Sequence, residues 1–86
     1  MTLAEFIAAL NAKFAGRYAF EIMPGRKFTR VVQVAYGQRS SYAFVDGEGN
    51  VYKSAGWKAP AKGVRANLAT LDMARVDEYG SWLYIR

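Results

Sequence analysis

Four basic residues lie in a stretch of the chain, residues 49–71, that contains no acidic residue. They are Lys53, Lys58, Lys62 and Arg65, and Trp57 sits among them. Lysine and arginine side chains bind phosphate oxygens, and an indole ring can stack on a nucleic-acid base. Because the 86-residue chain also carries a net charge of +5, we expect this stretch to attract a polyanion. A solvated surface face is the alternative explanation for the same charges.

The residues that usually perform catalysis are scarce. The chain has no cysteine and no histidine, which excludes thiolate nucleophiles, disulfides, zinc-finger ligand sets and the commonest general base. Asp46 and Glu48 lie in a Gly- and Asn-rich stretch that is typical of a turn. The acids near residues 72–78 match no calcium-binding loop, and no glycine-rich phosphate loop is present. We therefore predict a non-enzymatic binding protein with no catalytic residue, no metal site and no cofactor.

Hydrophobic periodicity predicts an α+β fold in a single domain, residues 1–86. Residues 2–14 have helical spacing, and Thr2 followed by Glu5 forms a capping-box pattern. A second helix is expected over residues 61–71, with Pro60 near its first turn. Between the helices, alternating residues predict an antiparallel sheet of three to four strands, at residues 17–23, 27–36, 39–46 and 51–54. Residues 81–85 alternate again and could add a C-terminal strand.

One hydrophobic core should hold this domain together, since 52% of the residues are hydrophobic. The residues expected to be largely buried are Phe6, Leu10, Phe20 or Phe28, Val32, Val34, Phe44, Val64 and Leu68. Arg30 shares a strand face with Phe28 and Val32, which indicates a face that is open at one end or an arginine that reaches out to water.

The predicted second helix decides how the basic stretch would work. The first turn of a helix offers unpaired N–H groups to anions, and Lys58, Lys62 and Arg65 would lie close to it. Two roles remain open for Trp57, which could stack on a base or brace the loop against the core. Aromatic and basic residues also alternate along the strands, as in sheets that bind single-stranded nucleic acid.

The run from Val51 to Arg65 (VYKSAGWKAPAKGVR) resembles a segment of small uncharacterised proteins of tailed bacteriophages. The resemblance implies a protein acting in the cytoplasm of an infected bacterium, and it implies no substrate. No stretch approaches the roughly 20 apolar residues that cross a bilayer, and Glu5 interrupts the place of a signal peptide, so we expect a cytoplasmic protein without membrane contact.

The sequence therefore predicts binding of nucleic acid, with single-stranded DNA or RNA favoured over duplex, through Lys53, Trp57, Lys58, Lys62 and Arg65. One alternative is a phage protein that binds a host protein through the same loop, because Trp and Arg are also favoured at protein interfaces. Another is a structural subunit that assembles through a sheet edge.

Overall fold

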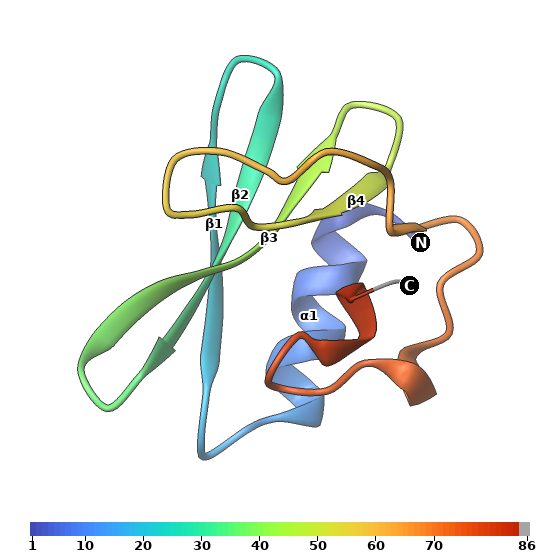
Figure 1. Ribbon diagram of the computed structural model, residues 1–86. Helices are drawn as coiled ribbons and strands as arrows, with labels where there is room; N and C mark the ends of the chain where they lie inside the picture. The colour runs from blue at the N-terminus through green and yellow to red at the C-terminus, as the bar shows by residue number, and fades with distance from the viewer. Residues whose placement is uncertain (85–86) are drawn as a thin grey trace.

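An antiparallel sheet in the strand order β1-β2-β3-β4-β5 forms the frame of the molecule, and one helix packs against a face of it (Figure 1). The computed structural model describes residues 1–84. Its elements are α1 (Leu3–Lys13), β1 (Ala19–Pro24), β2 (Phe28–Ala35), β3 (Gln38–Asp46), β4 (Asn50–Lys53), β5 (Ala66–Asn67) and the 3-10 helices η1 (Met73–Arg75) and η2 (Ser81–Leu83). The predicted α+β class with an antiparallel sheet is confirmed, and the fifth strand has only two residues.

Helix α1 begins and ends close to where its sequence predicts. The Thr2 hydroxyl accepts a hydrogen bond from the Glu5 amide, and the Glu5 carboxylate accepts one from the Thr2 amide, which is the predicted capping box. At the other end, the Lys13 ammonium donates to the carbonyl oxygens of Met73 and Val76 and so holds the C-terminal segment against the helix. Within residues 1–84, no helix combines the length and apolar character that crossing a membrane requires.

The first four strands form the predicted antiparallel meander. The pairing of β2 with β3 shifts between Val31 and Val32, so that Tyr42 has no partner on β2. The Tyr42 ring enters the core and stacks edge-on against Phe20, with 5.1 Å between ring centroids. Its hydroxyl donates to the carbonyl oxygen of Asp77, and burial raises the pKa of Tyr42 to about 12. The irregular strand thus ties the C-terminal segment to the sheet.

Asp46 closes the turn between β3 and β4. Its carboxylate accepts hydrogen bonds from the amides of Glu48 and Asn50, from the Asn50 side chain and from the Tyr52 hydroxyl, at 2.9–3.1 Å. Loss of water contact pushes the pKa of Asp46 upward, but these hydrogen bonds outweigh it and the pKa is lowered overall. The turn expected around Asp46 and Glu48 is confirmed, and it joins β3 and β4 as a hairpin.

The predicted helix over residues 61–71 is wrong. The segment runs antiparallel to β4, where the amide of Arg65 donates to Val51 and the amide of Leu68 donates to Gly49, both at 2.8 Å. Gly63 adopts a φ of +93°, which a right-handed helix does not allow. The edge of β4 offers N–H and C=O groups that need hydrogen-bond partners, and this segment supplies them. The three apolar residues at helical spacing favour a helix less strongly than this pairing favours an extended chain.

The predicted C-terminal strand is also wrong over residues 81–83, which form the 3-10 helix η2; Ile85 lies outside the described residues. A strand would place Trp82 and Leu83 on opposite faces. The tight turn instead directs both toward the core, where Leu83 is fully buried and Trp82 lies edge-on to Phe6.

The core lies between α1, the sheet and the C-terminal segment. Six of the expected residues are buried, namely Phe6, Leu10, Phe20, Val32, Phe44 and Leu68. Phe28 and Val34 are only partly buried. Val64 was expected inside but is 48% exposed, because the helix that would have turned it toward the core does not form.

Two truncations in this segment test the extended conformation. Leu68→Ala should lower the free energy of unfolding by about 2–5 kcal/mol, because it opens a cavity in the core. Val64→Ala should change it by about 0.5 kcal/mol or less, because Val64 packs against little. Urea unfolding, monitored by circular dichroism, measures the free energy of unfolding of both variants. Equal decreases for the two would contradict the extended conformation and favour the helix.

Candidate nucleic-acid interface

Within the acid-free stretch of residues 49–71, residues 54–60 form a closed loop. This loop lies over the sheet face opposite α1. The loop is pinned at its base, where Ser54 pairs with Pro60 and the amide of Ala61 donates to Lys53 at 2.7 Å. Within the loop, the amide of Ala55 donates to Ala59 at 3.0 Å. These bonds give the loop a fixed shape although most of its side chains face solvent.

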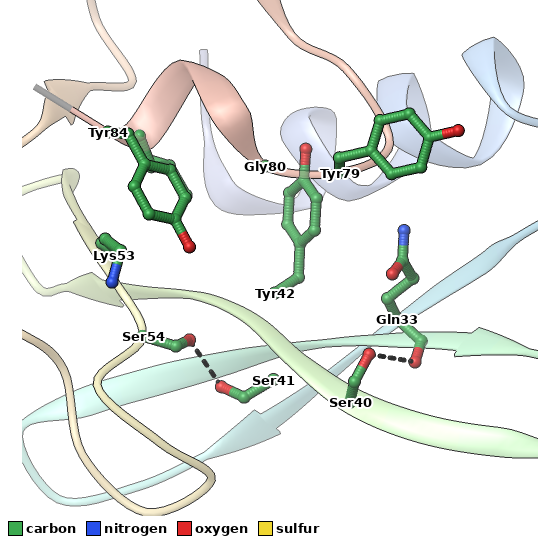
Figure 2. A pocket seen from close by; sticks show the side chains of 10 residues that line it. Gln33, Ser40, Ser41, Tyr42, Lys53, Ser54, Tyr79, Gly80 and Tyr84 are labelled. Carbon is green, nitrogen blue, oxygen red and sulfur yellow. Dashed lines mark hydrogen bonds between the residues drawn. The ribbon is translucent and has the colours of Figure 1, made fainter.

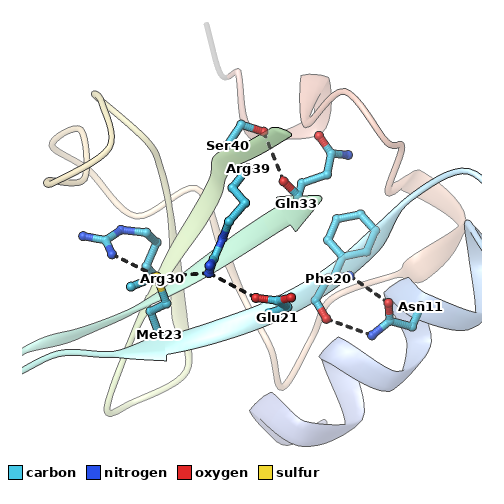
Figure 3. A network of polar contacts seen from close by, with 8 residues as sticks. All are labelled: Asn11, Phe20, Glu21, Met23, Arg30, Gln33, Arg39 and Ser40. Carbon is cyan, nitrogen blue, oxygen red and sulfur yellow. Dashed lines mark hydrogen bonds and ion pairs between the residues drawn. The ribbon is translucent and has the colours of Figure 1, made fainter. Parts of the chain in front are cut away.

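Arg30 holds this loop on the sheet. In the strand register, Arg30 lies opposite Met23 on one side and Phe44 on the other, so the three side chains share the outer face. The guanidinium lies 4.5 Å from the centroid of a Trp57 ring and 5.6 Å from that of Phe44. Its Nε donates to the carbonyl oxygen of Trp57 at 2.6 Å. Figure 3 shows Arg30 and Met23 reaching from neighbouring strands. The sequence suggested a face open at one end or an arginine reaching out to water, and the structure shows a third arrangement, in which Arg30 joins β2 to the loop.

Trp57 lies outside the core cluster and remains 40% exposed. Its backbone carbonyl and its ring both contact Arg30, so the residue braces the loop against the outer face rather than against the core. The remaining exposed ring surface is open to a ligand.

Basic side chains surround a hollow beside this stack. The hollow, here called the basic hollow, has a volume of about 200 Å³ and lies between the β1–β2 turn and the loop. Arg26, Lys27, Arg30 and Lys58 contribute to its lining, together with the rings of Phe28 and Phe44. No acidic residue of the described chain lines it. It is a site at which several cations converge over an apolar floor.

Most of the acidic side chains have partners away from these cations. Glu5, Asp46, Asp72 and Asp77 each accept hydrogen bonds from backbone amides at turns or helix ends. Along residues 1–84, the one ion pair joins Arg39 to Glu21 at 3.1 Å, on exposed side chains (Figure 3). The positive charge at the basic hollow is therefore not paired within the described chain.

The structure brings together only part of the predicted site. Lys58 lines the basic hollow, and Trp57 contacts Arg30 beside it without lining it. Lys53 lies over the ring of Tyr84, at 4.6 Å, and Lys62 is exposed without lining the hollow. Arg65 donates to the carbonyl oxygens of Leu83 and Lys62 and so anchors the C-terminal segment. The helix N-terminus that was expected to collect these cations does not form.

Three of the four cations that line the hollow, Arg26, Lys27 and Arg30, were not among the predicted site residues, because they belong to another part of the chain. Arg26 and Lys27 follow the Pro24-Gly25 turn, about 30 residues before the loop. Only the strand register and the course of the loop place them beside Lys58. A signal was available in Arg30, whose place between Phe28 and Val32 already marked this face as unusual.

Comparison with known proteins gives a family. Residues 4–85 match the model of a group described as "Family of unknown function (DUF7717)". The chain belongs to the DUF7717 family. The match spans both the basic hollow and the loop, so each lies within the region that defines DUF7717. Neither the curated proteins nor the solved structures contain a significant match to this DUF7717 chain.

The contact between Arg30 and Trp57 can be tested by removing the guanidinium. In this DUF7717 protein, Arg30→Ala should speed amide hydrogen exchange at residues 55–59, because both the Trp57 hydrogen bond and the ring contact are lost. Arg39→Ala removes an exposed ion pair on the same face and should leave that exchange unchanged. Unchanged exchange in Arg30→Ala would show that the loop is held by its own hydrogen bonds alone.

Proposed function

We propose that this protein is a non-enzymatic binding protein for single-stranded nucleic acid and that the strand lies across the basic hollow and Trp57. The observation that carries the proposal is the convergence of Arg26, Lys27, Arg30 and Lys58 on one hollow that no carboxylate lines. Phosphates of a nucleic-acid backbone are the anions that such a cluster fits, because several can bind at once.

Charge and position favour an external ligand for these side chains. Lys58 and the β1–β2 turn residues Arg26 and Lys27 are exposed, so they approach a phosphate without a large desolvation cost. Arg30 is already fixed by Trp57 and Phe44, so less side-chain entropy is lost when it binds. Lys53 adds positive charge beyond the loop, whereas Arg65 serves mainly the fold.

The aromatic groups favour a single strand over a duplex. Trp57 offers exposed ring surface beside the cations. A base can stack on such a ring only when it is not already stacked and paired in a duplex, and stacking tolerates every base. DNA and RNA share this chemistry, so both are candidates.

Two other roles follow from the same residues. A host protein could bind the loop, since Trp and Arg often anchor protein interfaces, and the resemblance to phage proteins would fit such a partner. Assembly through a sheet edge is disfavoured at β1, because Asn11 makes both an amide and a carbonyl hydrogen bond to Phe20 at that edge (Figure 3). Salt separates the roles, because phosphate binding weakens steeply with salt.

Salt titration of a double variant tests the proposal. Arg26→Ala with Lys58→Ala should weaken binding to all single-stranded sequences and lower the log–log salt slope by about 1.4, since each phosphate contact on a single strand contributes about 0.7. Fluorescence anisotropy with labelled DNA and RNA oligonucleotides measures both quantities.

Arg17→Ala with Arg75→Ala is the matched control. It removes the same charge from two exposed residues that do not line the hollow, so the slope should stay close to that of the native chain. Equal slopes for the two double variants would place the phosphates elsewhere. No salt-sensitive binding by the native chain would turn the proposal toward a protein partner.

A further inference from the structure

A second hollow opens on the other side of the loop, between β3 and the C-terminal segment (Figure 2). It has a volume of about 180 Å³, and its floor carries the hydroxyls of Ser40, Ser41 and Ser54. Here it is called the serine hollow. Tyr84 reaches down toward this floor from the C-terminal segment, while Gln33 and Tyr79 stand at the opposite side (Figure 2).

The serine hydroxyls and the Gln33 amide of the serine hollow are neutral, and hydrogen bonds hold them in place. The Ser41 and Ser54 hydroxyls are hydrogen-bonded to each other at 2.7 Å, and each keeps further donor or acceptor capacity. Gln33 donates its amide N–H to the carbonyl oxygen of Glu78 at 2.6 Å, which leaves its side-chain oxygen as an acceptor. Paired donors and acceptors of this kind match the edge of a nucleic-acid base better than they match a phosphate.

Aromatic surface and a single cation border this polar floor. Tyr84 is 64% exposed and Tyr79 is 76% exposed, although both line the hollow. The Lys53 ammonium lies 4.6 Å from the centroid of the Tyr84 ring. A planar ring could lie against Tyr84 with its edge toward the serines. The volume is smaller than that of sites for drug-sized ligands, roughly 300–1,000 Å³, and suits a single ring system.

The serine hollow is continuous with the proposed nucleic-acid path. A shallow depression shares Ser41 and Ser54 with it and extends to Arg39 and Trp57. Trp57 in turn contacts Arg30, which lines the basic hollow. A strand whose phosphates lie at the basic hollow can therefore continue over Trp57 to the serines.

We propose that the serine hollow accepts one unpaired base of the bound strand, which stacks on Tyr84 and forms hydrogen bonds to the serines and Gln33. The inference rests on the proposed function for the course of the strand, but the base site itself needs no phosphate. It adds a place where the protein can distinguish one base from another, which the basic hollow cannot do.

Nucleosides test this site separately, because they carry a base and no phosphate. Uridine, cytidine, adenosine and guanosine, and their deoxy forms, are titrated into the native chain to millimolar concentration while amide NMR shifts are recorded. At least one base should shift Ser40, Ser41 and Ser54 and leave residues 26–28 unchanged. The deoxy forms show whether the sugar hydroxyl contributes.

Tyr84 provides the matched variants. Tyr84→Ala should weaken nucleoside binding roughly five-fold or more, the effect of losing one stacking ring, and Tyr84→Phe should restore it. Because Tyr84 is largely exposed, both variants should keep the native fold, which the remaining amide spectrum checks. Absence of shifts at the serines for every nucleoside, or equal binding by Tyr84→Ala, would overturn the base site.

The outcomes also separate this inference from the proposed function. Salt-sensitive oligonucleotide binding without nucleoside shifts at the serines would keep the basic hollow and reject the base site. Nucleoside binding at the serines without any salt-sensitive oligonucleotide binding would keep the base site and reject the phosphate path.

Discussion

The contact between Arg30 and Trp57 determines the shape of the outer face of the sheet. A guanidinium over an indole ring contributes roughly 0.5–2 kcal/mol, and here the same arginine also bonds the Trp57 carbonyl. Within residues 1–84, this arginine supplies the hydrogen bond and the ring contact that join the middle of loop 54–60 to β2. With it, Lys58 lies beside the β1–β2 turn and the basic hollow has its second wall. The candidate site therefore depends on one residue in the middle of a strand.

Acidic and basic side chains have different hydrogen-bond partners in this fold, and this explains why the outer face of the sheet stays positive. Asp46, Asp72 and Asp77 are occupied by backbone amides, where they fix turns that the short chain needs. Some basic side chains donate to backbone carbonyl oxygens instead of carboxylates, as Lys13 and Arg65 do when they bind the C-terminal segment. Because these acidic side chains bind backbone amides, the cations of the hollow remain available for a ligand.

Local patterns predicted the first half of the fold well and the second half poorly. Residues 2–54 carry strong caps, turns and alternation, and each local preference agrees with the sheet. After Pro60, the chain lacks a strong pattern of its own, and its conformation is decided by partners distant in sequence. Residues 64–68 follow the open edge of β4, and η2 follows the core position of Leu83. For the same reason Trp57 and Lys58 were found from the sequence, whereas Arg26 and Lys27 required the register of β1 and β2.

The most direct test of the central claim is a map of the binding surface on the native chain. A short single-stranded oligonucleotide is titrated at low salt while backbone and indole NMR signals are followed. The largest shifts should fall at residues 26–30 and 57–58, on the face opposite α1. Shifts confined to α1 and η1, or no shifts at all, would contradict the assignment of this face as the site.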